Sequence, residues 1–130
     1  MNLATDTHPL LWLLDGSPRK LSRFARSAFA AAEEARITMH VPVIVLAEIV
    51  LLESLAKIDL SYSELVAQLA LRPGFSLENL TPEDIDSART LAHVRDPFDR
   101  LIAATASRLG VPLLTADEAL EEARGVTTRW

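Results

Sequence analysis

The segment from Arg95 to Asp117 restricts the fold most, because it has the pattern of one helix, a tight turn, a strand and a final acid. Asp96-Pro97 is a helix-start signal, since an Asp side chain accepts first-turn N–H groups and Pro is tolerated at the first helical position. Gly110 is expected to end the helix, and Val111 to Leu114 is a short apolar run typical of a strand. The segment therefore predicts a helix–strand unit with an acid at each end.

A third acid, Asp99, lies in the first turn of this helix, at the edge of its apolar face. At about 100° per residue, Ile102 and Ala106 lie near it on the helix surface. Its carboxylate is therefore expected to be partly buried against the core. Two interpretations stay open. Asp96 with Asp99 resembles a capping box worth roughly 1 kcal/mol, and Asp117 can cap a short helix at 118–123. Alternatively, the acids form a site.

The rest of the chain alternates predicted strands and helices. Strands are predicted at 2–5, 37–41, 75–79, 111–114 and 126–129, and helices at 17–32, 42–57, 61–71, 81–94, 96–110 and 118–123. This alternation predicts an α/β fold, a three-layer α/β/α sandwich with a mostly parallel central sheet. Sites in such folds lie at the carboxyl ends of the strands, where Asp6 and Asp117 are found.

Length and composition fit one globular domain. The 130 residues are 49% hydrophobic and 24% charged, so we expect a single domain over residues 1–130. The lack of cysteine excludes disulfides and thiolate metal sites, and with no signal peptide expected, a cytoplasmic location is natural. The longest apolar run, 41–52, contains Glu48 and is too short to span a membrane. The net charge of −5 argues against a protein that coats nucleic acid non-specifically.

Glu48 is unusual because its predicted helix places it on the core side. Four apolar residues lie within about 60° of it on the helical wheel: Ile44, Leu51, Leu52 and Leu55. Burial of an unpaired carboxylate is costly, so Glu48 must be protonated, hydrogen-bonded or facing a cation. The alternative is a glutamate at the helix edge that extends into solvent.

In a parallel sheet, Asp6, Asp117 and the helix turn that carries Asp99 converge on one edge, and Glu48 is the obvious fourth acid. Four carboxylates raise one another's pKa, and a hard divalent cation, Mg²⁺ or Mn²⁺, relieves their repulsion. Such an ion binds phosphate oxygens, makes water more acidic and neutralises the charge that develops at phosphorus. The acids therefore predict hydrolysis of a phosphodiester.

Other chemistries fit less well. A phosphatase with an aspartyl nucleophile would have a second acid two positions after Asp6, where His8 stands. A phosphorylated receiver domain would need a lysine near the acids, but neither Lys20 nor Lys57 is at a strand end. The three histidines lack zinc-ligand spacing, and the isolated glycines form no phosphate-binding loop.

Four segments together carry a pattern more specific than any single motif: Asp6 to Trp12, Glu48 after the second strand, Asp96 to Ala103, and Leu114 to Asp117. Over nearly the whole chain they resemble the PIN-domain ribonucleases, and most closely the VapC-type toxins. This resemblance implies a Mg²⁺- or Mn²⁺-dependent endoribonuclease. Its acidic residues, which would bind the metal and act in catalysis, fall on Asp6, Glu48, Asp99 and Asp117, with Asp96 as an auxiliary acid.

The same resemblance implies partners. It predicts the toxin of a type II toxin–antitoxin pair, which acts on RNA, forms a homodimer and is neutralised by a small antitoxin protein. Independently, the stretches 10–14 and 41–55 carry more apolar side chains than one small core needs, so a partner is expected to cover some of them. The alternative function is a catalytically idle PIN-fold module that serves as a partner subunit.

An acidic protein needs local positive charge to hold RNA. The expected positive rim consists of Arg19, Lys20, Arg23, Arg26, Arg95 and Arg100. Arg100, adjacent to Asp99, is the strongest candidate for a bidentate grip on a phosphate. The alternatives are a merely solvated basic face and a pair between Arg100 and Asp96, worth about 0.3–0.5 kcal/mol.

Overall fold

The computed structural model describes residues 1–130 and is built around a five-stranded sheet with the order β3-β2-β1-β4-β5. Every neighbouring pair of strands is parallel. The strands are β1 (Leu3–Thr5), β2 (Met39–Pro42), β3 (Phe75–Glu78), β4 (Leu113–Leu114) and β5 (Thr128–Arg129). All five predicted strands are present, and their carboxyl ends point to the same edge of the sheet.

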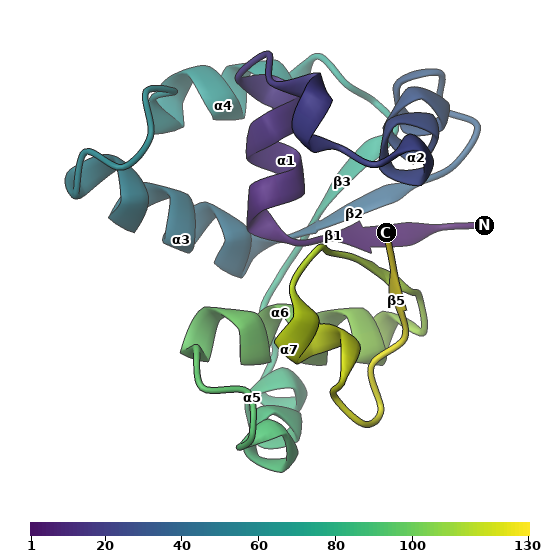
Figure 1. The fold of residues 1–130 in the computed structure, drawn as a ribbon, viewed down its shortest axis with the longest axis vertical. Coiled ribbons are helices and arrows are strands. Elements are labelled where there is room, and N and C mark those ends of the chain that lie inside the picture. Colours follow the sequence, from purple (N-terminus) through teal and green to yellow (C-terminus); the bar gives the residue numbers. More distant parts are fainter.

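The connections between the strands are mostly helical (Figure 1). The α-helices are α1 (Thr7–Leu14), α2 (Arg23–Glu33), α3 (Val43–Ser54), α4 (Tyr62–Ala70), α5 (Pro82–Ala88), α6 (Pro97–Leu109) and α7 (Glu118–Glu121). Two short 3₁₀ helices are η1 (Pro18–Lys20) and η2 (Arg89–Leu91). As predicted, Asp96 caps α6 and Gly110 ends it, in the left-handed conformation with φ 68°.

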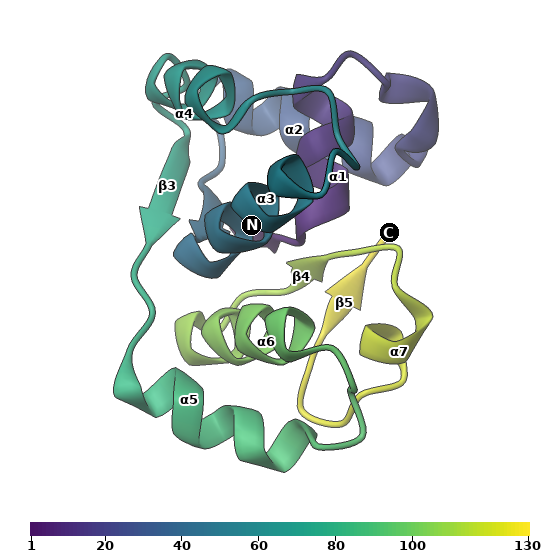
Figure 2. The same cartoon turned by 90° about the vertical axis from the view of Figure 1, so that its left-hand side faces the viewer.

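Helices cover both faces of the sheet, as the two perpendicular views show (Figures 1 and 2). Successive strand residues point to opposite faces, so Leu3 and Met39 pack with α2 in one hydrophobic cluster. Ala4 and Val41 instead belong to a larger cluster with residues of α3, α4 and α6. These layers confirm the predicted three-layer α/β/α fold. No helix has the length and apolar character needed to cross a membrane.

Some predicted helix limits are wrong for local reasons. The helix predicted from residue 17 begins only after Ser22, because Leu21 is extended (ψ 138°) and the Ser22 hydroxyl accepts the Ala25 N–H at 3.0 Å. Ser17 makes no such side-chain cap, so Pro18 starts only the short η1. The helix predicted at 81–94 ends at residue 88 and continues as η2, and the apolar stretch 10–14 is part of α1.

The two apolar stretches expected to need a partner differ in exposure. In α1, Leu10, Leu11 and Leu14 are buried in the larger hydrophobic cluster of the chain itself. On α3 and at its C-cap, by contrast, exposed apolar side chains remain: Val43, Val50, Leu51 and the C-cap residue Leu55. Of the two stretches, only 41–55 therefore leaves apolar side chains for a partner to cover.

Candidate metal and active site

The strand-to-helix turn after β1 fixes the orientation of Asp6. Its Oδ1 accepts the N–H of Thr7 at 2.8 Å, and its Oδ2 accepts the hydroxyl of Thr115 at 2.7 Å. The parallel register brings these groups together, because Thr5 of β1 pairs with Leu114 of β4. Asp6 is only 5% exposed, so both of its oxygens are held in a mostly dry environment.

Glu48 reaches the same place from α3. It is partly buried, and its Oε1 accepts a hydrogen bond from the hydroxyl of Thr7, the first residue of α1. Thr7 thus contacts two acids at once, with its backbone N–H directed to Asp6 and its hydroxyl to Glu48. A buried glutamate held by one donor still keeps one oxygen for another ligand.

Asp99 completes a group of three carboxylates. Each of Asp6, Glu48 and Asp99 offers an oxygen, and these oxygens all lie within 4.8 Å of one another. Asp96 alone caps α6, because its Oδ1 accepts the N–H groups of Phe98 at 2.8 Å and of Asp99 at 3.2 Å. The capping box considered for Asp96 and Asp99 is not formed, so the Asp99 carboxylate faces the other acids.

The acids strongly affect one another's protonation. Burial, followed by the negative charges of four neighbouring acids, raises the pKa of Asp99 from 3.8 to about 8. Burial also raises the pKa of Asp6, against the opposing hydrogen bonds from Thr115 and Thr7. Burial likewise raises the pKa of Glu48, although the Thr7 hydroxyl stabilises its charged form. Without a cation, this cluster therefore favours protonated carboxyls.

Asp96 and Asp117 line the same hollow as the three clustered acids. This acid hollow has a volume of about 330 Å³ and includes Asp6, His8, Pro9, Trp12, Glu48, Asp96, Asp99, Ala116 and Asp117. Asp117 caps α7, since its Oδ1 accepts the N–H of Ala119 at 2.8 Å. Asp96 and Asp117 can therefore each cap a helix and also contribute an oxygen to the site, because each uses only Oδ1 for its cap.

The two threonines that orient the acids were missed by the sequence reasoning. Thr7 is 1% exposed and begins α1 two residues after the end of β1, and Thr115 is 3% exposed and directly follows β4. The sequence contains a signal for them, because a hydroxyl next to an acid at a strand end is well placed to hydrogen-bond that acid and fix its orientation. His8 and Trp12, neither of them among the predicted site residues, form another part of the wall of the hollow.

None of the six basic residues expected at the rim lines the acid hollow. Arg100 donates instead to the backbone carbonyls of Val94 and of Ala92, the latter at 2.9 Å. It pairs neither with Asp96 nor with the other acids. Arg95 and the basic residues near the start of α2 are exposed.

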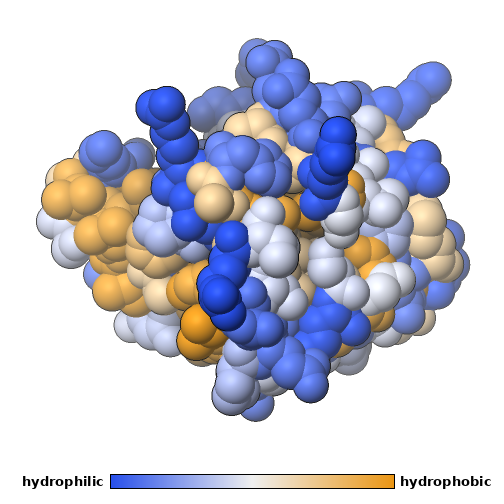
Figure 3. All heavy atoms as spheres, turned by 90° about the horizontal axis from the view of Figure 1, so that it is seen from below, coloured by the Kyte–Doolittle hydropathy of each residue, from blue (hydrophilic) through white to orange (hydrophobic).

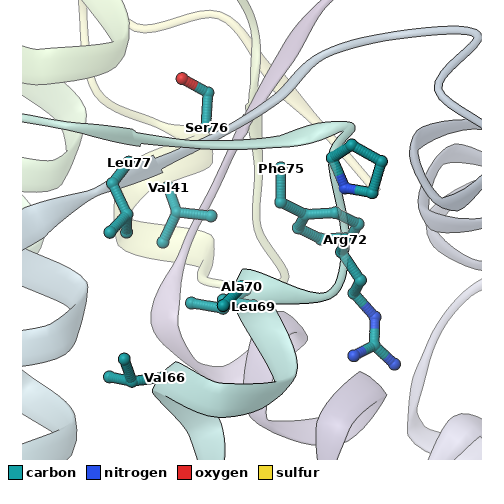
Figure 4. A pocket seen from close by; sticks show the side chains of 9 residues that line it. Val41, Val66, Leu69, Ala70, Arg72, Phe75, Ser76 and Leu77 are labelled. Atoms are coloured by element: carbon teal, nitrogen blue, oxygen red, sulfur yellow. The ribbon is translucent and has the colours of Figure 1, made fainter.

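A larger apolar cavity of about 430 Å³ lies beside the edge strand β3 and α4 (Figure 4). Its wall is mainly hydrophobic and includes Val66, Leu69 and Phe75. The one charged residue there, Arg72, pairs with Glu33 at 3.2 Å. The cavity therefore lacks acid–base groups, and the acid hollow is the better candidate for an active site.

The acid hollow suits a hard divalent cation. Its clustered donors are carboxylate oxygens, the ligands preferred by Mg²⁺ and Mn²⁺, with no thiolate present. A cation would also relieve the repulsion that raises the pKa of Asp99. The residues present therefore fit such an ion, with Asp6, Glu48 and Asp99 as its ligands.

Comparison with known proteins places this geometry in a family. Two solved structures cover 99% of this chain at 14% identity: VapBC2 from Rickettsia felis bound to a promoter DNA fragment (98% of that chain, TM-score 0.72) and DNA-bound VapBC from Salmonella typhimurium (97%, TM-score 0.71). A toxin–antitoxin complex from Klebsiella pneumoniae is 20% identical, with 98% of each chain covered and a TM-score of 0.63. No curated protein matches the chain. The model of the PIN domain family matches residues 3–126, so the chain belongs to the PIN domain family.

Proposed function

We propose that this protein is a Mg²⁺- or Mn²⁺-dependent endoribonuclease that hydrolyses RNA phosphodiester bonds. The observation that carries the proposal is the group of three carboxylates whose oxygens lie within 4.8 Å of one another at the carboxyl edge of the sheet. Membership of the PIN domain family supports it.

The residues of the acid hollow would have different roles. Asp6 and Glu48 are held by hydroxyl and amide donors, so they would present ligand oxygens in a preset geometry, and Asp99 would complete the ligand set. When bound, the ion would neutralise charge on the phosphoryl group and make water more acidic. Asp96 and Asp117 each keep Oδ2 free of protein donors, so either oxygen can accept a proton at the wall of the hollow.

We further propose that the protein is the toxin of a toxin–antitoxin pair and forms a homodimer. The similar solved structures are VapBC and toxin–antitoxin complexes, although their low identity supports only a shared fold. Exposed apolar residues of α3 and its C-cap offer a surface for a partner: Val43, Val50, Leu51 and Leu55. Hydrophobic atoms gather at the left of the space-filling view (Figure 3). If an antitoxin covers α3, its co-expression should suppress both dye binding to this surface and RNA cleavage.

The nuclease activity can be tested with purified, antitoxin-free protein and labelled structured RNA. We expect cleavage with Mg²⁺ or Mn²⁺ and none with EDTA, and loss of at least about 100-fold in Asp99→Asn, which removes a ligand. Asp86→Asn is the matched control, because Asp86 is exposed and lies outside the hollow. Equal cleavage by Asp99→Asn would reveal a contaminating nuclease. No metal-dependent cleavage of any RNA would favour the idle partner module.

A further inference from the structure

A second cavity, of about 560 Å³, adjoins the acid hollow and shares His8 and Trp12 with it. We call it the lysine cavity; Lys20 and Lys57 line it, together with Asp15 and Asp59. Its volume lies in the range of roughly 300–1,000 Å³ that is typical of small-ligand sites. A chain molecule lying in both cavities would therefore pass over His8 and Trp12.

The cavity gathers the only two lysines of the chain. Lys20 comes from η1 and Lys57 from the loop after α3, and neither takes part in an ion pair. Of the two acids in the wall, Asp15 already accepts the N–H of Ser17 at 3.0 Å. The two ammonium groups are thus available to an anionic ligand, and flexible lysines are well suited to phosphate.

The boundary between the two cavities is aromatic. His8 and Trp12 lie one turn apart on α1, with ring centroids 5.9 Å apart. Trp130 packs edge-on against Trp12 at 6.0 Å, which supports the indole from another side. Aromatic rings beside a basic groove are the recurring means of binding single-stranded nucleic acid, since every base has a face that can stack.

We infer that the lysine cavity binds the nucleotide next to the scissile bond of a single-stranded RNA. Lys20 and Lys57 contact the neighbouring phosphate, and the base stacks at His8 and Trp12. This inference rests on the proposed nuclease function, which places the scissile phosphate in the acid hollow. A single strand is favoured over a duplex, because only an unpaired base exposes its face to a side chain.

Two arginines away from both cavities supply a control for the lysines. Arg36 and Arg124 are exposed, line neither cavity and were not expected at the positive rim. The double variants Lys20→Gln/Lys57→Gln and Arg36→Gln/Arg124→Gln change the net charge equally. All four side chains are exposed, so neither variant disturbs the core, and matching thermal melts of both variants and the wild type verify this.

The test measures binding of a labelled single-stranded RNA oligonucleotide by fluorescence anisotropy in EDTA, so that no cleavage occurs. Two phosphate contacts contribute about 1.4 to the slope of log Kd against log salt for a single strand. Between about 50 and about 200 mM salt, the wild type should therefore lose about sevenfold more affinity than the lysine variant. The arginine variant should keep the wild-type slope, and Asp59→Asn should bind more tightly than the wild type.

The outcome of this binding test is independent of the outcome of the cleavage test for the proposed nuclease. If the lysine and arginine variants show the same slope, or if the wild type does not bind, the lysine cavity is not an RNA site. Wild-type cleavage of RNA with Mn²⁺ would then still support the proposed function. Conversely, lysine-dependent binding without any metal-dependent cleavage would show that the lysine cavity binds single-stranded RNA, but it would overturn the nuclease and with it the position next to a scissile bond.

Discussion

Replacement of Asp99 by Asn should stabilise the metal-free protein, by an amount that grows with pH. Burial and the charges of the four neighbouring acids raise the pKa of Asp99 from 3.8 to about 8. The folded state therefore binds a proton that the unfolded chain releases, so the free energy of unfolding is highest below about pH 4 and falls as the pH rises toward 8. Asparagine has nearly the same shape as aspartate but no charge. The free energy of unfolding of the Asp99→Asn protein should therefore not fall in this way as the pH rises.

The size of the effect follows from the same pKa. The interval between 3.8 and about 8 corresponds to roughly 6 kcal/mol as an upper limit, which is reached only above about pH 8. Asp99 is only partly buried, so solvent screening reduces this figure. We expect Asp99→Asn to raise the free energy of unfolding by about 1–2 kcal/mol near pH 8.5 and by almost nothing near pH 4.

Urea unfolding in EDTA at several pH values measures this difference directly. Glu122→Gln is a suitable control, because Glu122 is exposed and lies outside the acid hollow. Its stability relative to the wild type should not change with pH. A destabilised Asp99→Asn protein, or a gain that does not depend on pH, would refute the repulsion argument and leave Asp99 with a structural role.

Three further predictions test the site and its support. Mn²⁺ at about 100 times its Kd should stabilise the wild type by about 2.7 kcal/mol in thermal melts but have little effect on Asp99→Asn. Thr115→Val should destabilise the protein by about 1–3 kcal/mol in urea unfolding, because it removes a donor from the buried Asp6, whereas Thr127→Val, at an exposed position, should not. Arg108→Gln should cost roughly 2–4 kcal/mol at pH 7, because Asp84 is fully buried and pairs with Arg108 at 2.7 Å. Burial raises the pKa of Asp84, but the hydrogen bonds from Arg108 and Thr81 outweigh it, so the pKa is lowered and the gap between variant and wild type should close as the pH falls below 3.8.

The fold could be predicted because its signals are local. Apolar runs of strand type, each followed by a helix, occur in an order that only a parallel sheet with helical crossovers satisfies. A parallel sheet places all strand ends at one edge, so Asp6 and Asp117 had to approach each other. The position of Glu48 followed from its helical face, since a glutamate among leucines needs a partner.

The direction of Arg100 could not be predicted, because it depends on backbone that is not regular. The chain between η2 and α6 leaves the carbonyls of Ala92 and Val94 without helical partners, and the guanidinium of Arg100 donates to both. A helical wheel places Arg100 beside Asp99 but contains no information on these carbonyls.

The arrangement of donors explains why the acid hollow can exist before a cation binds. Asp6 sits at a strand end and receives two hydrogen bonds, and Glu48 receives one, so part of their repulsion is offset within the fold. Asp99 lies on a helix turn and its pKa is raised to about 8, with no donor among the causes. In the fold itself, the repulsion on Asp99 is therefore relieved by a proton rather than by a hydrogen-bond donor. A cation that displaces this proton gains the charge of Asp99, so its affinity should rise with pH up to about 8.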